Sequence, residues 1–405
     1  MAKLKILCAP ANEGGCSYYR VIAPMKKLHE LYGDQVEIRY NLNPLGIIEE
    51  GENKGKWDED WQYEDMKWAD VVWTNNISNW GGPYTARIVG KAKEFGKFVH
   101  FDTDDLLTDL YEGHRLYDVY KERNLEEITK FIYNHSDLVT VTQRKFAERI
   151  KPYCGGVLAI VKNAIDYNLP CWNVPKTPRP KKKFVRIGWA GGIHHEEDVK
   201  EFAGVPSMVN QRAGRENCSW GFYGAPTLEK GKKREWQHEV WDNYKRMLLQ
   251  GFRGQPNWQI YNALPPDSYG GIYANIDLAI APLQMNAFND SKSEIKVAEC
   301  GRYGVPLIAS DVGCYDETIV NGKTGYLLPA NAPASEWAKI LVKCVKNPQH
   351  VAEMGRNLNK ITEEYFDLNK VVKHRLELYQ EAIGLVSSRD KDKGVNFNTD
   401  WEFNA

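Results

Sequence analysis

Residues 277–328 decide the fold, and they read DLAIAPLQMNAFNDSKSEIKVAECGRYGVPLIASDVGCYDETIVNGKTGYLL. The stretch begins with the apolar run 278–283, which is short and turns sharply at Pro282, as expected of a buried strand. A polar loop, a helical segment and a second apolar strand at 307–309 follow. Strand, loop, helix and strand in this order are typical of a parallel α/β sheet, whose ligand sites lie at the carboxyl ends of the strands.

The helical segment carries signals at both ends. Residues 291–294 read Ser-Lys-Ser-Glu, the pattern of a capping box that opens a helix. Gly304 permits a left-handed stop and Pro306 prevents continuation, so we expect the helix to end near Tyr303.

The predicted helix has an unusual polar face. Lys292, Lys296, Glu299 and Tyr303 follow one another at spacings of four, three and four, so they share one stripe. Two cations near a helix start, where free backbone amides attract anions, suit a diphosphate, and the carboxylate one turn deeper suits vicinal hydroxyls. A solvated Lys–Glu pair on an exposed helix would have the same pattern and would contribute only about 0.2–0.5 kcal/mol.

The stretch also contains a longer set of residues with a familiar order and spacing. They are Asp277 with Ala281-Pro282, Lys292-Ser293 with Lys296 and Glu299, Gly304-Val305-Pro306, Ala309-Ser310, Gly313 and residues 321–325. This set resembles the donor-binding half of GT-B glycosyltransferases, in the large retaining group 1 family that contains sucrose synthases and many bacterial mannosyl- and glucosyltransferases.

The chain departs from that family at one motif. The second glutamate of the family's E-x7-E motif holds the nucleotide ribose, and the resemblance maps it to Glu299. The first glutamate would fall at Ser291, so this chain instead resembles a variant with lysine and serine at the helix start.

Length and composition set the outer limits. A chain of 405 residues is expected to form two domains, and a net charge of −1 gives no general attraction to nucleic acid or acidic membranes. The eight cysteines show no C-x-x-C spacing, so we expect neither a zinc site nor a disulfide framework. No apolar segment has the length of a signal peptide core or a membrane span, and we expect a cytoplasmic protein.

The resemblance implies a division of the chain into five parts. They are an N-terminal Rossmann-like acceptor-side domain (1–168), a Pro/Lys-rich linker (169–183), a C-terminal Rossmann-like nucleotide-sugar-binding domain (184–365), a helix that crosses back to the first domain (366–386) and a polar tail (387–405).

Two glycine-containing turns follow predicted strands. Gly14 and Gly15 come after the first strand and allow backbone amides to approach a ligand, although they are equally consistent with a tight turn. The fingerprint G-x-G-x-x-G is absent, which argues against a nicotinamide or flavin site. The resemblance places this loop across the cleft from the donor and makes Arg20 a candidate for contact with its sugar or phosphate.

The second turn, residues 190–195, reads AGGIHH and opens the second domain. Gly191 and Gly192 at a strand-to-helix junction favour a phosphate cradle. Many relatives place an arginine after this strand and a lysine five residues later, both on the diphosphate. That arginine is missing here, so we expect Lys292 and Lys296 to replace it, assisted by His194 or His195.

Carboxylates follow the strand predicted at 97–101. Asp102, Asp104 and Asp105 at the carboxyl end of a strand form an active-site pattern, because burial and mutual repulsion shift their proton affinities. We expect an acceptor-side or catalytic role for Asp102 or Asp104. Asp105 could instead cap a helix that begins at Leu106. The same residues spell D-x-D, the metal-binding signature of a different glycosyltransferase fold, GT-A.

The resemblance as a whole implies a GT-B enzyme, with two doubly wound α/β domains facing each other across a cleft. It implies a hexosyl- or pentosyltransferase that moves a sugar from a nucleoside diphosphate donor, which we take to be a UDP-sugar, to a saccharide or glycolipid hydroxyl. Retention of configuration is implied, and no metal or other cofactor is expected. The catalytic residues are expected to be Asp102, Asp104, Lys292 and Lys296. The expected donor-binding residues are Gly14, Gly15, Arg20, Gly191, Gly192, His194, Ser293, Glu294, Ile295 and Glu299.

The sequence is also compatible with three further functions. The acceptor could be a hydroxylated base in DNA, since viral DNA-modifying glycosyltransferases share the fold. The aromatic insert 229–249 and the basic stretch 181–186 could then contact nucleic acid in a host cytoplasm. Packing is the default explanation for Trp236, Val240 and Tyr244 of that insert. The second is a metal-dependent GT-A enzyme that uses Asp102 and Asp104, and the third is an inactive nucleotide-sugar-binding module.

Overall fold

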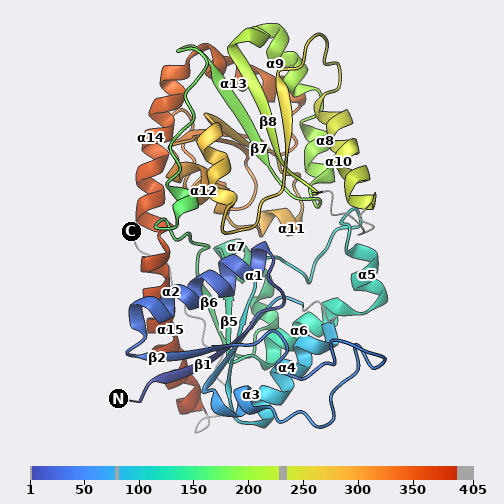
Figure 1. The fold of residues 1–405 in the computed structure, drawn as a ribbon, viewed down its shortest axis with the longest axis vertical. Coiled ribbons are helices and arrows are strands. Elements are labelled where there is room, and N and C mark those ends of the chain that lie inside the picture. Colours follow the sequence, from blue (N-terminus) through green and yellow to red (C-terminus); the bar gives the residue numbers. More distant parts are fainter. Residues whose placement is uncertain (1, 78–81, 228–234, 390–405) are drawn as a thin grey trace.

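The computed structural model describes residues 2–77, 82–227 and 235–389. They form two α/β halves, one above the other in Figure 1, each built on a six-stranded sheet in which every pair of neighbouring strands is parallel. The predicted doubly wound α/β architecture is confirmed.

The first sheet has the strand order β2-β1-β3-β4-β5-β6. Its strands are β1 (Leu4–Ala9), β2 (Val36–Tyr40), β3 (Val71–Asn75), β4 (Phe98–Asp102), β5 (Leu138–Val141) and β6 (Val157–Ile160). The helices of this half are α1 (Gly15–Ser17), the π-helical turn η1 (Tyr18–Ile22), α2 (Ala23–Tyr32), α3 (Glu64–Trp68), α4 (Gly82–Glu94), α5 (Tyr117–Glu122), α6 (Leu125–His135), α7 (Arg144–Ile150) and η2 (Lys151–Tyr153).

The second sheet has the order β12-β11-β10-β7-β8-β9. Its strands are β7 (Val185–Ala190), β8 (Cys218–Ala225), β9 (Trp258–Asn262), β10 (Leu278–Ala281), β11 (Leu307–Ser310) and β12 (Gly325–Leu328). Its helices are α8 (Glu196–Glu201), α9 (Val205–Ala213), η4 (Arg215–Asn217), α10 (Glu235–Leu248), η5 (Tyr269–Asn275), α11 (Ala287–Asp290), α12 (Ile295–Arg302), η6 (Tyr315–Glu317), α13 (Ala334–Lys346) and α14 (Pro348–Tyr365).

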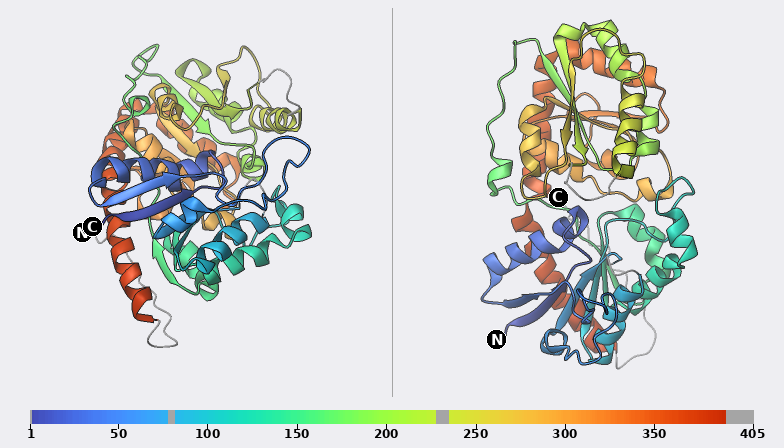
Figure 2. Two further views of the ribbon diagram at one scale, coloured as in Figure 1. Left: turned by 60° about the horizontal axis from the view of Figure 1, so that its bottom comes forward. Right: turned by 45° about the vertical axis from the view of Figure 1, so that its right-hand side comes forward.

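Each sheet is covered on both faces by helices, so each half has two apolar layers. The strands read as apolar runs because both of their faces are buried. The last helix, α15 (Leu368–Arg389), leaves the second half and packs against α2 and β1 of the first. Figures 1 and 2 show it, in red, running alongside the first sheet.

The segment between the halves is not a free tether. It contains η3 (Pro170–Trp172), and Trp172 is buried against Tyr273 and Tyr303 of the second half. Residues 181–183 are exposed, whereas the Arg186 guanidinium is bound to the buried carboxylate of Asp277. Arg186, predicted as part of a basic stretch, is therefore engaged with a carboxylate of its own half.

The predicted capping box at residues 291–294 is wrong. Asn286 caps the short helix α11 by accepting from the amide of Asn289, and Ser291 Oγ donates to the carbonyl of Ala287, which closes that helix. The next helix, α12, begins only at Ile295. Lys292 therefore precedes α12, and the side-chain stripe predicted from helical spacing does not include it.

Two more local predictions can be compared with the structure. No helix begins at Leu106, because residues 103–116 form turns, so Asp105 caps nothing there. The insert 229–249 contains α10, and its residues 229–234 lie outside the described part of the chain. Val240 and Tyr244 are buried, while Trp236 is exposed and lies under the Arg115 guanidinium.

Candidate functional site

A pocket of about 260 Å³ lies between the two halves, where the carboxyl ends of the two sheets face each other. Side chains from both halves line it, as the parallel topology predicts for a ligand site. The first half contributes Gly15, Cys16, Tyr19, Asp104, Asp105 and Asn163, and the second contributes His195, Leu283, Lys292, Ser293, Ile295, Lys296 and Tyr315.

The start of α12 gives one wall of this pocket a positive character. The first amides of a helix have no intrahelical acceptor, and they carry the positive end of the helix dipole. Lys296 lies in this first turn, where its ammonium donates to the carbonyl of Ala190, and burial lowers its pKa. Amides and ammonium together form a site suited to an anion.

Lys292 adds a second cation to the same wall. Its Nζ lies 3.3 Å from Oδ1 of Asp105 and 4.3 Å from the centre of the Phe288 ring. Burial, the largest single influence, disfavours the charged ammonium, but Asp105, Cys16 and Asp198 together outweigh it, and the pKa of Lys292 is raised. The lysine is therefore charged at neutral pH.

Glu299 lies one turn deeper in α12 and is 4% exposed. Its Oε2 accepts from the Tyr273 hydroxyl at 2.8 Å, and its Oε1 accepts from the Tyr19 hydroxyl at 3.3 Å. Burial raises the pKa of Glu299, although Lys296 and the two tyrosines oppose this shift. Tyr19 comes from the π-helical turn η1 of the opposite half, so this carboxylate is shared between the halves.

Two carboxylates and a thiol face this positive wall. Burial and the neighbouring Asp105 raise the pKa of Asp104 to about 6, and the Asn76 amide donates to it at 3.3 Å. The ligand atoms of Cys16, Asp104 and Asp105 all lie within 4.8 Å of one another. These three residues could hold a metal, but the Lys292 ammonium already supplies a positive charge to Asp105.

Asp102 and Arg20, both predicted to act on a ligand, do not line the pocket and are instead engaged with other residues of the protein. Asp102 is fully buried between two guanidiniums, with Arg20 Nε at 2.6 Å from Oδ1 and an Arg375 nitrogen at 2.8 Å from Oδ2. Burial alone would raise the pKa of Asp102, but the two arginines lower it. Arg20 also donates to the carbonyl of Val161 and to Asn163, so the cluster joins η1, β4, α15 and the segment that follows β6.

The Glu294 side chain is also engaged elsewhere. Its buried carboxylate accepts from Lys162 Nζ at 2.6 Å and from Cys314 Sγ at 2.6 Å. Ser293 and Ile295 do line the pocket, and Asn163 of the first half donates to Ser293 Oγ at 2.8 Å. The side chain of Glu294 therefore ties the halves together, like the Asn163–Ser293 contact.

Of the four glycines in the two predicted turns, only Gly15 lines the pocket, whereas the Gly14 amide donates to the Asn12 side chain. Gly191 donates to the carbonyl of Tyr223, and a Cβ there would lie 2.4 Å from the Trp189 ring, so close packing explains this glycine. Neither Gly191 nor Gly192 lines the pocket.

Of the two adjacent histidines, His195 lines the pocket and His194 does not. His194 instead stacks on His114 of the first half, with ring centres 6.0 Å apart. Sequence reasoning also missed Cys16, Tyr19, Asn163 and Tyr273. For His195 the sequence does contain a signal: its i, i+3 spacing from Asp198 indicates that the histidine can pair with that carboxylate.

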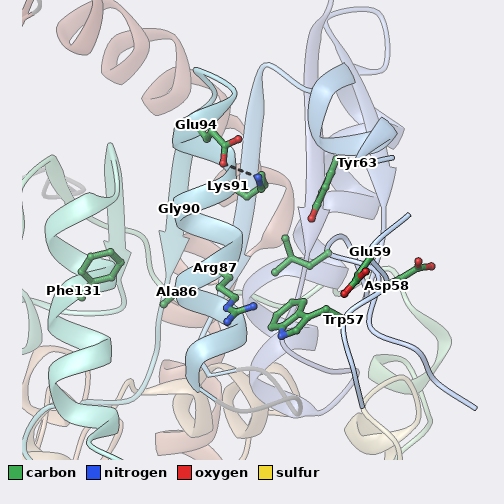
Figure 3. Close-up of a pocket in the computed structure, with 11 residues that line it drawn as sticks. Trp57, Asp58, Glu59, Tyr63, Ala86, Arg87, Gly90, Lys91, Glu94 and Phe131 are labelled. Atoms are coloured by element: carbon green, nitrogen blue, oxygen red, sulfur yellow. Dashed lines mark hydrogen bonds and ion pairs between the residues drawn. The ribbon is translucent and has the colours of Figure 1, made fainter. Parts of the chain in front are cut away.

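A second pocket of about 550 Å³ lies in the first half, between α4, α6 and residues 57–63 (Figure 3). Its charged and aromatic groups engage one another. Arg87 lies 4.1 Å from the centre of the Trp57 ring, and Lys91 pairs with Glu94 at 2.6 Å. It lies away from the strand ends that form the cleft, so the smaller pocket is the candidate site.

Comparisons with known proteins bear on the second half of the chain and on the fold. Residues 186–347 match the family model described as Glycosyl transferases group 1. A curated relative, D-inositol 3-phosphate glycosyltransferase from Gordonia bronchialis, is 28% identical over 132 residues, which are 32% of this chain and only 27% of that relative.

Solved structures match over nearly the whole chain. Sucrose-phosphate synthase from Thermosynechococcus elongatus is 12% identical with a TM-score of 0.67 and covers 95% of this chain and 100% of its own. Anabaena HepE in complex with UDP-glucose is 14% identical with a TM-score of 0.56 and covers 95% of this chain and 100% of its own. None of the helices among the described residues is long and apolar enough to cross a membrane. The chain therefore has the GT-B fold, and its residues 186–347 carry the match to the group 1 glycosyl transferases.

Proposed function

We propose that this protein is a metal-independent glycosyltransferase that moves a sugar from a nucleoside diphosphate donor to a hydroxyl acceptor. The observation that carries the proposal is the wall formed by Lys292, Lys296 and the α12 amides, with Glu299 one turn deeper. This wall lies inside the region that matches the group 1 glycosyl transferases. A diphosphate at the cations would bring the ribose hydroxyls toward Glu299.

The two lysines and the amides would act where charge develops. When the bond between the sugar and the diphosphate breaks, its electron pair moves to the departing phosphate oxygen. Fixed cations and amide donors around that oxygen lower the barrier, because they need no reorganisation during the step. This arrangement would do the work that a divalent cation does in other transferases.

The donor is proposed to be a UDP-sugar, because HepE, with the same fold, was solved with UDP-glucose. The acceptor is proposed to be a saccharide or glycolipid hydroxyl, with retention of configuration. Asp104 faces the pocket from the opposite half, where it can orient an acceptor hydroxyl. The engagement of Arg186 with Asp277 removes part of the basic surface that a DNA acceptor would need, and the GT-A hypothesis is wrong because the fold is GT-B.

The test is release of nucleoside diphosphate from a panel of UDP-, GDP- and ADP-sugars, with and without saccharide acceptors. Release that depends on Lys296 and Glu299 supports the proposal, and Lys339→Ala, on the exposed surface of α13, serves as the matched control. Tight binding of a nucleotide sugar without any turnover would instead support an inactive binding module.

A further inference from the structure

Trp236 differs from the other tryptophans in the described part of the chain. It is 42% exposed, whereas every other tryptophan within residues 2–77, 82–227 and 235–389 is buried or partly buried. It lies in the first turn of α10, the helix of the insert, which packs against α8. A single exposed aromatic ring is ordinary on a protein surface, so the groups around it decide whether it forms a site.

The rest of α10 is fixed against the wall of the candidate site. Trp241 and Tyr244 pack on the Trp189 ring, with ring centres 5.8 and 5.7 Å away. The Tyr244 hydroxyl accepts from the backbone amide of His195 at 3.0 Å, and His195 lines the pocket. Trp236 is therefore carried on a helix that is anchored beside the pocket. Figure 1 shows the lower end of α10 next to the segment that precedes α5 of the first half.

Polar groups from both halves lie around the Trp236 ring. The guanidinium of Arg115, from the first half, lies over the ring at 4.7 Å from its centre. Glu196, which follows His195, has its Oε2 3.9 Å from an Arg115 nitrogen, and its Oε1 accepts from the Asn243 side chain at 3.4 Å. Trp236 and Asn243 are seven positions apart and so share one face of α10. We refer to Arg115, Glu196, Trp236 and Asn243 as the rim cluster.

The rim cluster has the chemistry of a sugar-binding surface. The face of an indole ring is electron-rich and attracts the polarised C–H groups on one side of a sugar ring. The Arg115 guanidinium forms no hydrogen bond to another described residue, so its N–H groups are free to donate to hydroxyl oxygens, and Glu196 can accept from hydroxyl groups. Arg115 and Glu196 have opposite charges, which favours a neutral polyhydroxyl ligand over a strand of nucleic acid with its repeated phosphates.

We propose that the rim cluster binds a second sugar unit of the acceptor, so that the acceptor is a saccharide chain of two or more units. This inference rests on the function proposed above and narrows the acceptor of that site. Trp236 lies outside the pocket that contains Asp104, so a sugar ring on Trp236 is a different unit from the one whose hydroxyl reacts. Because Arg115 and Trp236 come from different halves, the subsite is complete only when the two halves meet.

The experiment measures binding of the intact protein to an array of saccharides of one to four units, built from glucose, galactose, mannose and their acetamido derivatives. We expect the wild type to bind at least one chain of two or more units more tightly than the corresponding monosaccharide. Trp236→Ala should weaken this binding on the order of tenfold, the size of a lost aromatic contact. Trp236→Tyr keeps an aromatic ring and should restore most of the affinity. Arg115→Gln, on the other half, should weaken binding of the same chains.

Trp68→Ala is the matched control. The Arg39 guanidinium lies 4.2 Å from the centre of the Trp68 ring, so this variant also removes a contact between tryptophan and arginine. Trp68 ends α3 shortly before β3 begins, and it therefore lies at the amino end of the sheet, away from the cleft. The control should bind the same chains as the wild type. Thermal melting identifies any variant that does not fold.

Turnover shows whether the subsite serves the acceptor. The chain that binds best on the array is used as acceptor, with UDP-glucose, GDP-mannose and ADP-glucose as donors. Trp236→Ala should raise the KM for this acceptor on the order of tenfold, the same aromatic contact. It should leave the KM for the donor unchanged, and also the hydrolysis of the donor without acceptor. An equal fall in donor hydrolysis would show that Trp236 only holds the two halves together, and it would overturn the inference.

The outcomes separate the two proposals. If the wild type neither binds nor hydrolyses any of the three nucleotide sugars, the proposed function fails and the acceptor role of the rim cluster falls with it. If it uses a nucleotide sugar but binds no chain of the array, or if Trp236→Ala binds the chains as well as the wild type, the proposed function stands and the inference is overturned. Binding of a short oligothymidylate that Trp236→Ala loses would also overturn it, because the rim cluster would then be a nucleic acid site.

Discussion

The hydroxyl of Tyr19 reaches across the cleft and donates to Oε1 of Glu299 at 3.3 Å, although the two residues are 280 positions apart in the chain. Tyr273, on the same half as Glu299, holds Oε2 more closely, at 2.8 Å. One carboxylate oxygen is thus held from within its own half, and the other is occupied by a group that a ligand can displace.

Tyr19→Phe should therefore tighten nucleotide binding. A ribose hydroxyl that binds Oε1 must displace Tyr19, and a phenylalanine removes the competing hydrogen bond, which is worth about 0.5–1.5 kcal/mol. Titration calorimetry with UDP should show affinity about two- to tenfold higher, the equivalent of this energy.

Two variants of the same cluster serve as controls. Tyr273→Phe should weaken UDP binding. It removes the hydrogen bond that fixes Oε2 of Glu299 but leaves Oε1 occupied by Tyr19. Glu299→Ala should weaken it by roughly 1.5–3 kcal/mol, the value of a charge-assisted hydrogen bond. Unchanged affinity in Glu299→Ala would remove this carboxylate from the nucleotide site.

Lys292→Ala and Lys296→Ala should lower kcat more than they raise KM. If the lysines stabilise charge that appears only as the glycosidic bond breaks, their loss acts on the transition state, at a cost on the order of 100-fold in kcat. Steady-state kinetics of nucleoside diphosphate release measures both constants. A rise in KM at constant kcat would show that the lysines only anchor the bound donor.

Treatment with EDTA should leave activity intact, since two ammonium groups and the α12 amides provide the positive charge of the pocket. The assay compares turnover before chelation, after chelation and after addition of manganese. Loss that manganese restores would assign a metal to Cys16, Asp104 and Asp105, the three ligands that lie together there. Asp104→Asn should then abolish the restoration.

Asp104→Asn should stabilise the protein at pH 7 while it lowers activity. The folded state raises the pKa of this carboxyl to about 6, above its value in an unfolded chain, so ionisation above that pH costs folding free energy. The asparagine variant has no such cost, and its free energy of unfolding should be higher by roughly 1–3 kcal/mol. Urea unfolding at pH 7 and pH 5 checks the sign, because the difference should shrink at the lower pH.

Asp102→Asn should have the opposite effect on stability. It leaves the guanidiniums of Arg20 and Arg375 buried without their counter-charge, and breaking such a cluster costs about 3–5 kcal/mol. The pKa of Asp102 is lowered in the folded state, so its contribution is present above the unfolded pKa and is lost as the pH falls below about 4. Urea unfolding across this range should show a smaller acid-induced loss in the variant than in the wild type.

The sequence by itself determined the parallel α/β architecture and the end of the helix near Tyr303. Short apolar runs, Gly304 and Pro306 act through their immediate neighbours, so they can be interpreted without a partner from elsewhere in the chain. The predicted helix start at residues 291–294 was wrong. Asn286 caps the separate short helix α11, and Ser291 ends α11 instead of opening α12.

Only the tertiary structure decided which polar groups face the cleft. Asp102 and Asp104 look equivalent in sequence, but α15 brings Arg375 against Asp102 from 273 positions away, and this arginine and Arg20 enclose the carboxylate. The pairing of Tyr19 with Glu299 likewise depends on how the two halves meet. Burial and charge pairing are set by such distant segments, and no local pattern records which segments will come together.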